Sequence, residues 1–263
     1  MSEPKLSRRD FLKYASLAGG TALVVKLIRN GWVSPLDPAN ANASNPINEA
    51  LSKRRWAMVI DQGKCIGCNY CTFACQATND IPGDAQWNTV SVEGQTTKGP
   101  AYLPRPCMHC ENAPCVEACP VGATYRRADG LIEMDYKKCI GCRYCQVACP
   151  YNARVFNWQD PTKLQNSYVP RWGVPEIPRR SRGVVEKCTF CAQRIDRGLA
   201  NSQVPGVDHD ATPACVNACP VGARLFGDLN DPNSQVSKAL AQRRSFRLRE
   251  DLGTSPRVYY LPA

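Results

Sequence analysis

The sequence predicts an α+β fold in which short strands and short helices surround two kinds of cysteine-rich unit, each present twice. All sixteen cysteines of the 263-residue chain fall into four groups of four, with none left over. Two spacing patterns alternate in the order A, B, A, B, and strand-like segments follow the groups. The groups are Cys65, Cys68, Cys71 and Cys75; Cys107, Cys110, Cys115 and Cys119; Cys139, Cys142, Cys145 and Cys149; and Cys188, Cys191, Cys215 and Cys219.

The first 43 residues have the features of an export signal. Residues 7–13 (SRRDFLK) match the twin-arginine signature, and a mildly apolar segment, residues 14–25, follows. Small-residue cleavage candidates lie at 39–41 and 41–43. We expect a twin-arginine signal peptide over residues 1–43 and a peripheral location on the periplasmic, extracytoplasmic face of the membrane. Whether the leader is cleaved stays open.

An amphipathic anchor or a short membrane helix is the alternative for this leader. Its apolar segment is interrupted by Gly19 and Gly20 and followed by Lys26. It is too short for a bilayer, which needs about 20 apolar residues. No other run resembles a transmembrane helix, so no transmembrane segment is expected in the mature protein.

Residues 56–61 (WAMVID) predict a strand that leads into the first cysteine group. The spacing of this group, C-x2-C-x2-C-x3-C, recurs almost residue for residue at 139–149, where Pro150 follows. Three cysteines two residues apart can direct three thiolates onto three corners of one iron–sulfur cubane, while the fourth points toward a second cluster. One such run therefore implies a partner run.

The residues between these cysteines suit a cluster loop. Gly141 lets the backbone approach the sulfurs closely and adopt dihedrals that other residues avoid. Ile140, Tyr144 and Val147 are expected to form an apolar wall that keeps water off the cluster.

Zinc and disulfides are the alternatives for these cysteines. Zinc sites with four cysteines usually consist of two C-x2-C pairs well separated in sequence, and exported proteins often form disulfides. Neither requires a third and a fourth cysteine at these spacings followed by proline. The spacing therefore favours iron–sulfur clusters.

The second and fourth groups share a different pattern. The second has C-x2-C-x4-C-x3-C-P spacing, and its latter half recurs at 215–223. In the fourth group, residues 192–214 separate Cys191 from Cys215. We expect this insertion to be a solvated loop, with a partner-docking loop as the alternative.

The remaining segments are assigned from local composition. Strands are expected at 123–127, 131–135, 153–158 and 223–228. Residues 161–182, rich in proline and arginine, predict an extended connector, with a basic docking surface as the alternative. Residues 231–234 (DPNS) predict a capped helix over 235–242, with Pro232 in its first turn. The tail from 243 to 263 has no chemical motif.

The net charge of +10 suggests a nucleic-acid or membrane-surface partner at first. Residues 1–43 hold six basic and three acidic side chains, so the rest of the chain carries +7. An oxidised cubane with four thiolates carries roughly −2, so four of them bring the mature protein close to neutral. The basic excess therefore indicates compensation for clusters, and no nucleic-acid partner is expected.

The order of the cysteine groups, the twin-arginine leader and the C-T-F-C at 188–191 resemble a known family. It comprises the four-cluster ferredoxin-type iron–sulfur subunits of membrane-associated quinol/quinone oxidoreductases, such as tetrathionate, polysulfide and dimethyl sulfoxide reductases, the cytochrome-linked nitrite reduction system and the sulfite-reduction-associated Dsr complex. The resemblance covers roughly residues 54–263. It is specific for the cofactor and weakly specific for the substrate.

The resemblance implies two interleaved bacterial ferredoxin-like modules, each with two [4Fe-4S] clusters, and hence four clusters in all. We number the implied ligand sets: set 1 is Cys65, Cys68, Cys71 and Cys219; set 2 is Cys188, Cys191, Cys215 and Cys75; set 3 is Cys107, Cys110, Cys115 and Cys149; set 4 is Cys139, Cys142, Cys145 and Cys119. The implied domains are a first module at 44–100 and 183–228, a second at 101–160, the connector at 161–182, and a C-terminal helix and tail at 229–263.

The resemblance also implies single-electron hopping between partner subunits. One is an integral-membrane quinone-interacting subunit of the NrfD type, and the other a molybdopterin catalytic subunit or a multihaem cytochrome c. It does not specify the terminal substrate, the direction of electron flow or the cluster potentials.

The chain itself shows no arrangement for substrate chemistry. Its only histidines are His109, expected in a supporting or solvent-facing position, and His209, expected at the surface. No Ser-His-Asp, paired-carboxylate or phosphate-loop pattern is present, so no catalytic residue is expected. Two other functions stay open: a structural zinc or disulfide module, and a self-contained reductase of a small substrate.

Overall fold

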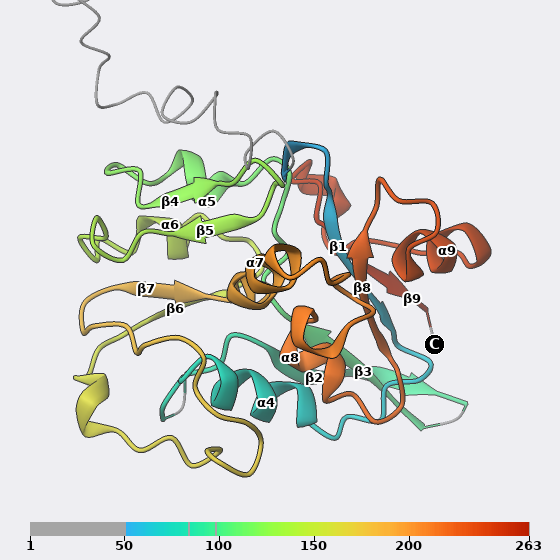
Figure 1. Ribbon diagram of the computed structural model, residues 1–263, viewed down its shortest axis with the longest axis horizontal. Coiled ribbons are helices and arrows are strands. Elements are labelled where there is room, and N and C mark those ends of the chain that lie inside the picture. The colour runs from blue at the N-terminus through green and yellow to red at the C-terminus, as the bar shows by residue number, and fades with distance from the viewer. Residues whose placement is uncertain (1–50, 84, 98, 263) are drawn as a thin grey trace, which may run out of the picture. The chain divides into compact units, whose positions relative to one another are not determined.

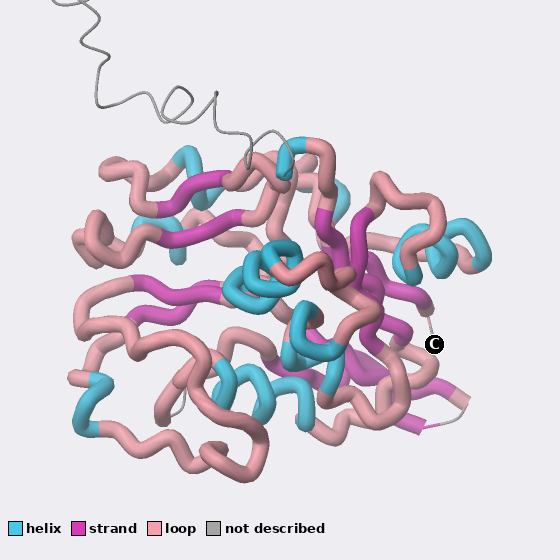
Figure 2. Tube along the Cα trace, viewed as in Figure 1, coloured by secondary structure: helices cyan, strands magenta, loops and turns pink. Residues whose placement is uncertain are grey.

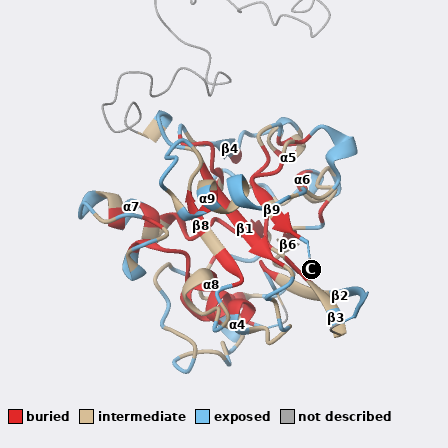
Figure 3. Ribbon diagram, turned by 90° about the vertical axis from the view of Figure 1, so that its right-hand side faces the viewer, coloured by how far each residue is buried: buried red, intermediate tan, exposed pale blue. Residues whose placement is uncertain are grey.

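A three-stranded sheet lies at the centre of the fold. Its middle strand, β1 (Trp56–Asp61), pairs antiparallel with β8 (Arg224–Asp228) and parallel with β9 (Val258–Leu261). Every residue of β1 is buried, which fits its nearly continuous apolar sequence. Figure 3 shows these strands in the interior. The computed structural model describes residues 51–83, 85–97 and 99–262, all within one compact unit, Ser44–Ala263.

Three two-stranded antiparallel ribbons surround this sheet. They are β2 (Thr89–Thr96) with β3 (Gly99–Arg105), β4 (Thr124–Arg126) with β5 (Ile132–Met134), and β6 (Arg154–Phe156) with β7 (Val185–Lys187). Because these strands are short, much of the chain runs as loop (Figure 2). The loops carry most of the cysteines.

The described helices are short, and each of them except α9 begins beside a cysteine. The α-helices are α4 (Tyr70–Thr78), α5 (Pro114–Glu117), α6 (Tyr144–Val147), α7 (Ala192–Ala200), α8 (Ala214–Asn217) and α9 (Gln235–Gln242). Single 3₁₀ turns lie at Pro161–Lys163, His209–Ala211 and Glu250–Leu252.

The duplication seen in the sequence is repeated in the backbone. Helix α4 packs against α8, and α5 packs against α6 (Figure 1). The Asp61 amide donates to the Ala223 carbonyl at 2.7 Å, and the Asp135 amide donates to the Ala123 carbonyl at the same distance. Each half therefore joins the strand before an A-type group to the strand after a B-type group.

Several sequence predictions of secondary structure are confirmed. The strand at 56–61 is β1, and the four strands predicted after cysteine groups are β4, β5, β6 and β8 within one to two residues at each end. The helix at 235–242 is α9, whose N-cap Ser234 accepts from the Ser237 amide. Pro232 precedes this cap, so its predicted place in the first turn is wrong.

The insertion at 192–214 differs from the predicted loop. It contains α7 and the turn His209–Ala211, and Ile195 is fully buried. A Cβ on Gly198 would lie 2.2 Å from the Cβ of Ala211, so the glycine lets helix and turn pack closely. The amphipathic pattern of residues 192–200 encodes this helix.

The connector and the C-terminal tail both pack against other parts of the fold. In the connector, Tyr168 stacks on Phe73 and Trp172 contacts both Phe73 and Tyr70. In the tail, β9 completes the central sheet. These segments lie against elements far away in sequence, which composition alone does not reveal.

The predicted signal peptide, residues 1–43, lies outside the described residues. Within the ranges that the structure describes, no helix is long and apolar enough to cross a membrane.

Candidate metal centres

The first cysteine group forms a tight loop between β1 and α4. Gly67 has a φ of +70°, and a Cβ there would lie 2.3 Å from the ring of Tyr102. Asn69, also left-handed with a φ of 61°, precedes α4, and Cys71 and Cys75 lie within that helix. Gly141 and Arg143 repeat these two conformations in the third group, with φ values of 70° and 62°.

Set 1 lines a cavity. All four of its cysteines, Cys65, Cys68, Cys71 and Cys219, surround about 340 Å³ of space that is free of protein atoms and partly open to solvent. Val90, Pro104 and Val221 form apolar parts of the wall. The structure therefore brings together three cysteines of the first group and one from the fourth.

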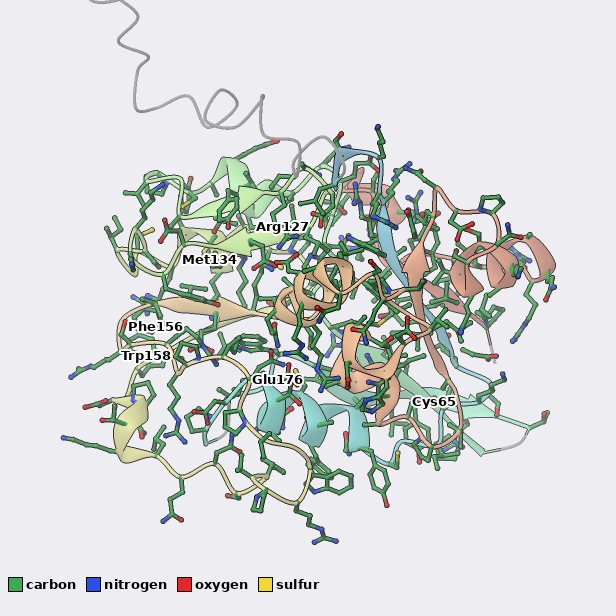
Figure 4. The ribbon with its side chains drawn as sticks, viewed as in Figure 1. Cys65, Arg127, Met134, Phe156, Trp158 and Glu176 are labelled. Atoms are coloured by element: carbon green, nitrogen blue, oxygen red, sulfur yellow. The ribbon has the colours of Figure 1, made fainter. Side chains whose placement is uncertain are left out.

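Set 4 lines the equivalent cavity in the other half. Cys119, Cys139, Cys142 and Cys145 surround about 270 Å³ of such space, beside Met134. In Figure 4, Cys65 of the first cavity and Met134 of the second lie well apart. The two cavities are thus separate sites.

Set 2 is more deeply buried. Burial raises the pKa of the Cys75 thiol well above its ordinary value, and the neighbouring thiols of Cys188, Cys191 and Cys215 raise it further. Asn79 Nδ2 lies 3.6 Å from Cys75 Sγ and 3.7 Å from Cys191 Sγ and donates to both. All four cysteines of this set therefore meet in the interior.

Set 3 converges in the same way. Burial raises the pKa of Cys110 to about 12, and Cys107, Cys115 and Cys149 act in the same direction. The pKa of Cys107 is also raised by burial and by Cys115 and Cys149, with Lys187 opposing. The cysteines of sets 2 and 3 thus lie within electrostatic range of one another, and those of sets 1 and 4 line shared cavities.

The four sets follow one another in space. Cys71 of set 1 influences Cys215 of set 2, whose pKa burial raises to about 12. Cys107 of set 3 is, after burial, the largest cause of the raised pKa of Cys188 in set 2. Burial raises the pKa of Cys145 in set 4, and Cys115 of set 3 also raises it, while Arg154 opposes the shift. These electrostatic interactions relate consecutive sets in the order 1, 2, 3, 4.

Backbone amides donate to several of the sulfurs. Ala123 N lies 3.2 Å from Cys119 Sγ, and Ala223 N lies at the same distance from Cys219 Sγ. Burial favours the neutral thiol at Cys119, but amide hydrogen bonds outweigh this effect and lower the pKa of the thiol. Such donors stabilise thiolates, the form in which cysteine binds metals.

The geometry speaks against disulfides and does not suit a lone ion. All sixteen cysteines are free thiols. Among the residues that the structure describes, no three or more histidine, cysteine or acidic side chains are grouped to hold a single metal ion. The cysteines instead surround larger spaces, and donors such as Arg154 Nη2, buried without a hydrogen-bond partner, lie beside them. This donor set fits a multi-iron cluster with thiolate ligands.

The predicted apolar wall around the third group is present only in part, because Ile140 lines the cavity of set 4 but all three predicted residues are largely exposed. Ile140, Tyr144 and Val147 are 65%, 61% and 81% exposed, and Cys142 is the one exposed cysteine of the sixteen. The counterparts Tyr70 and Phe73 contact aromatic rings of the connector instead. The duplicated sequence does not show this difference, because the covering residues belong to another segment.

The two histidines occupy very different positions. His109 is fully buried and stacks on Phe190 with 3.9 Å between ring centroids. Its Nδ1 accepts from the Ile132 amide, which leaves Nε2 to donate to the Cys188 carbonyl at 3.0 Å. Burial holds the pKa of His109 well below its usual range, and the positive charge of Lys187 lowers it further. His109 therefore joins two halves of the chain as a neutral ring, whereas His209 is exposed as predicted.

The sequence interpretation missed several polar residues next to the cysteines. Asn79 and Asn88 donate to sulfurs, and Arg154, Lys187 and Arg224 are buried among the sets. Both arginines stand five residues after the last cysteine of their group. That spacing was a signal the sequence offered.

Comparisons with known proteins agree with this arrangement. A model of the 4Fe-4S dicluster domain matches residues 64–123 and 138–223, and a second model of the same description matches 100–166. A tetrathionate reductase subunit of Salmonella typhimurium is 37% identical over 97% of this chain and 88% of its own length. The iron–sulfur cluster-binding subunit of menaquinone reductase from Nitratidesulfovibrio vulgaris is 43% identical over 80% and 89%.

A third relative extends the comparison to another sulfur compound. A polysulfide reductase polypeptide of Wolinella succinogenes is 35% identical over 80% of this chain and 95% of its own length. With the repeated cysteine groups and the tandem ferredoxin-type fold, these matches place the protein in a family. It belongs to the 4Fe-4S dicluster-domain proteins, among the ferredoxin-type iron–sulfur subunits of respiratory reductase complexes.

Proposed function

We propose that this chain is an electron-transfer subunit that relays single electrons through four [4Fe-4S] clusters within a respiratory reductase complex. The observation that carries the proposal is the convergence of sixteen cysteines into four sets, each next to the following one. The relatives are subunits of tetrathionate, polysulfide and menaquinone reductases, and the last is named as iron–sulfur cluster-binding, which supports the same function.

We assign sets 1 to 4 as the ligands of the four clusters. The cavities of sets 1 and 4, the buried convergence of sets 2 and 3 and the amide donors to Cys119 and Cys219 support this assignment. When bound, [4Fe-4S] clusters supply one-electron redox chemistry whose potential depends on hydrogen bonds, charge and burial. The role of the protein is to hold the ligands, exclude water and set these surroundings.

The succession of sets supplies a path through the protein. Electrostatic interactions between Cys71 and Cys215, Cys107 and Cys188, and Cys115 and Cys145 relate consecutive sets. Sets 2 and 3 in the middle are built mainly from buried cysteines, whereas sets 1 and 4 line cavities partly open to solvent. An electron carrier with two partners requires such accessible ends.

We place one electron-exchanging contact at set 4. Cys142 is exposed there, and Ile140, Tyr144 and Val147 present apolar surface around it. Exposed apolar side chains grouped around a functional site are typical of protein contact surfaces. At set 1 the equivalent aromatic residues are partly covered by Tyr168 and Trp172.

The relatives and the leader support a proposal for the partners and the location. Menaquinone reductase among the relatives supports a quinone-handling membrane subunit at one end of the path. Tetrathionate and polysulfide reductases among the relatives support a catalytic subunit, and a multihaem cytochrome is the other candidate for that position. The twin-arginine motif at residues 7–13 supports a periplasmic, extracytoplasmic location.

Metal analysis of the anaerobically purified full chain tests this function. Four cubanes predict roughly sixteen iron and sixteen sulfide per chain. Dithionite reduction should produce electron paramagnetic resonance signals of reduced, interacting clusters. Iron near zero with bound zinc would instead support the structural module and reject the proposal.

A further inference from the structure

Arg224 lies between sets 1 and 2. Its side chain is buried, lines the cavity of set 1 and donates from Nη2 to Asn88 Oδ1 at 2.6 Å. Its Nη1 lies 3.5 Å from Met58 Sδ. Its charge acts on thiols of both sets, including Cys71 and Cys215.

Arg154 occupies the corresponding position between sets 3 and 4. It too is buried, its Nη1 lies 3.3 Å from Thr124 Oγ1 and 3.2 Å from Met134 Sδ, and its Nη2 has no hydrogen-bond partner. Burial lowers the pKa of Arg154, but nearby thiolates of both sets, led by Cys115 and Cys145, outweigh this and raise it. In each half, a buried arginine thus lies beside a methionine sulfur and the thiols of two sets.

Lys187 lies between sets 2 and 3. Its side chain is fully buried, and Nζ donates to the Cys188 carbonyl at 2.8 Å and to the Ile132 carbonyl. Its charge acts on Cys107 of set 3. Glu133 is within its electrostatic range, but the pair does not approach to an ion-pair distance in the described structure.

None of these three cations forms an ion pair with a carboxylate within 4.0 Å among the described residues. Burying an unpaired charge costs free energy, so a compensating negative group is expected nearby. The groups that meet this need here are the cysteine thiolates and the clusters they would hold, which carry net negative charge. Arg180, another buried arginine, differs because it pairs with Glu186. Arg257 is buried without an ion pair too, and its Nη1 donates to the Asp129 carbonyl.

We propose that Arg224, Lys187 and Arg154 are positioning residues that supply one fixed positive charge at each of the three junctions between consecutive clusters. The inference rests on the proposed function, because it assumes that the four sets hold clusters. Each reduction step adds a negative charge in a medium of low dielectric constant. A cation between two clusters favours the reduced form of both and offsets the repulsion between electrons on neighbouring clusters.

Charge-removing variants of the full chain test this assignment. A redox titration followed by electron paramagnetic resonance measures the effect. In Arg154→Met, the equilibrium constant for reduction of the clusters in sets 3 and 4 should fall by about tenfold. Arg224→Met should act on sets 1 and 2, and Lys187→Met on sets 2 and 3. For a one-electron couple, a tenfold change is a shift of about 59 mV.

Matched variants separate charge from packing. Arg154→Lys and Arg224→Lys keep the charge and should largely restore the potentials. Arg257→Met removes a buried cation whose main charged neighbours are Glu111, Arg55, Arg126 and Asp129, and it should leave all four potentials unchanged. Potentials unchanged in Arg154→Met and Arg224→Met, or shifted equally at all four clusters, would overturn the inference.

Iron content separates the two levels of failure. Wild-type chain without iron and sulfide would reject the proposed function itself. Variants that retain full iron but wild-type potentials would reject only the role of the cations. If Arg154→Met loses a cluster, Arg154→Gln and Arg154→Lys are compared. Cluster loss in Arg154→Gln but not in Arg154→Lys supports a role for the positive charge. Cluster loss in both variants contradicts that role.

Discussion

Cys107 and Cys188 lie within electrostatic reach of each other, although they belong to the second and fourth cysteine groups. After burial, Cys107 is the largest cause of the raised pKa of Cys188. His109 and Lys187 both donate to the Cys188 carbonyl. The electrostatic interaction between Cys107 and Cys188 relates set 2 to set 3, and so the two halves of the proposed path.

Replacing Cys188 should interrupt the path in its middle. Cys188→Ala removes a ligand of set 2, and we expect the iron content to fall by up to about four per chain while sets 1, 3 and 4 keep their clusters. Iron and sulfide analysis, with spin integration of the reduced protein, measures this loss. Thr189→Ser, a conservative change at the next buried position, is the control. Unchanged iron in Cys188→Ala would contradict the assignment of this ligand.

Removing a hydrogen bond to sulfur should lower one potential selectively. Asn79 donates to both Cys75 and Cys191 of set 2. Such bonds favour the reduced cluster. In Asn79→Ala, the equilibrium constant for reduction of the cluster in set 2 should therefore fall by about threefold to tenfold. A redox titration measures the effect, and the exposed Asn201→Ala serves as the control. An equal shift in both variants would show that Asn79 has no specific role.

The aromatic cover over the first cysteine run should contribute to stability. Trp172 contacts Tyr70 and Phe73 at centroid distances of 4.5 and 5.3 Å. Aromatic pairs contribute about 0.5–1.5 kcal/mol each, so Trp172→Ala should lower the apparent unfolding temperature and expose the connector to proteolysis. Trp158→Ala, at a 62% exposed position, should have a smaller effect. Equal effects would mean that the connector is held by other contacts.

Glu133 should make stability depend on pH. Burial raises the pKa of this carboxyl from 4.5 to about 7, with Lys187 and Arg127 opposing. The folded state then binds the proton more tightly than the unfolded chain, so this contribution to stability is fully present below pH 4.5 and is lost as the pH rises through about 7.

Glu133→Gln cannot ionise, so the variant should lose less stability than the wild type between about pH 5 and 8. The difference should be about 1–3 kcal/mol. Apparent unfolding temperatures across this range provide the comparison, since proteins with bound clusters seldom unfold in two states. Parallel curves for the two proteins would show that Glu133 ionises freely in the folded state.

The cysteine loops and their strands could be predicted from the sequence because their information is local. The spacing around Gly67 and Gly141 encodes tight loops, and both glycines have positive φ. The apolar run at 56–61 encodes the buried central strand β1. The grouping of cysteines into sets came instead from the family resemblance, since spacing alone does not say which distant cysteine completes each set.

The missed features depend on contacts between distant segments. Strand β9 is recognisable as part of the sheet only once β1 is placed beside it, and the exposure of Tyr144 depends on the connector covering Tyr70 and leaving Tyr144 uncovered. Helix α7 lies within the insertion at 192–214, which the position between Cys191 and Cys215 predicts as a loop. Lys187 and Arg154 look like ordinary surface cations in the sequence, and only the packing shows them buried.

Anomalous diffraction at the iron absorption edge, on crystals of the anaerobically purified protein, tests the central claim most directly. We expect four separate iron clusters, one within each of sets 1 to 4, arranged in that order through the protein. Iron bound by cysteines of a single group, or only at the two cavities of sets 1 and 4, would contradict it.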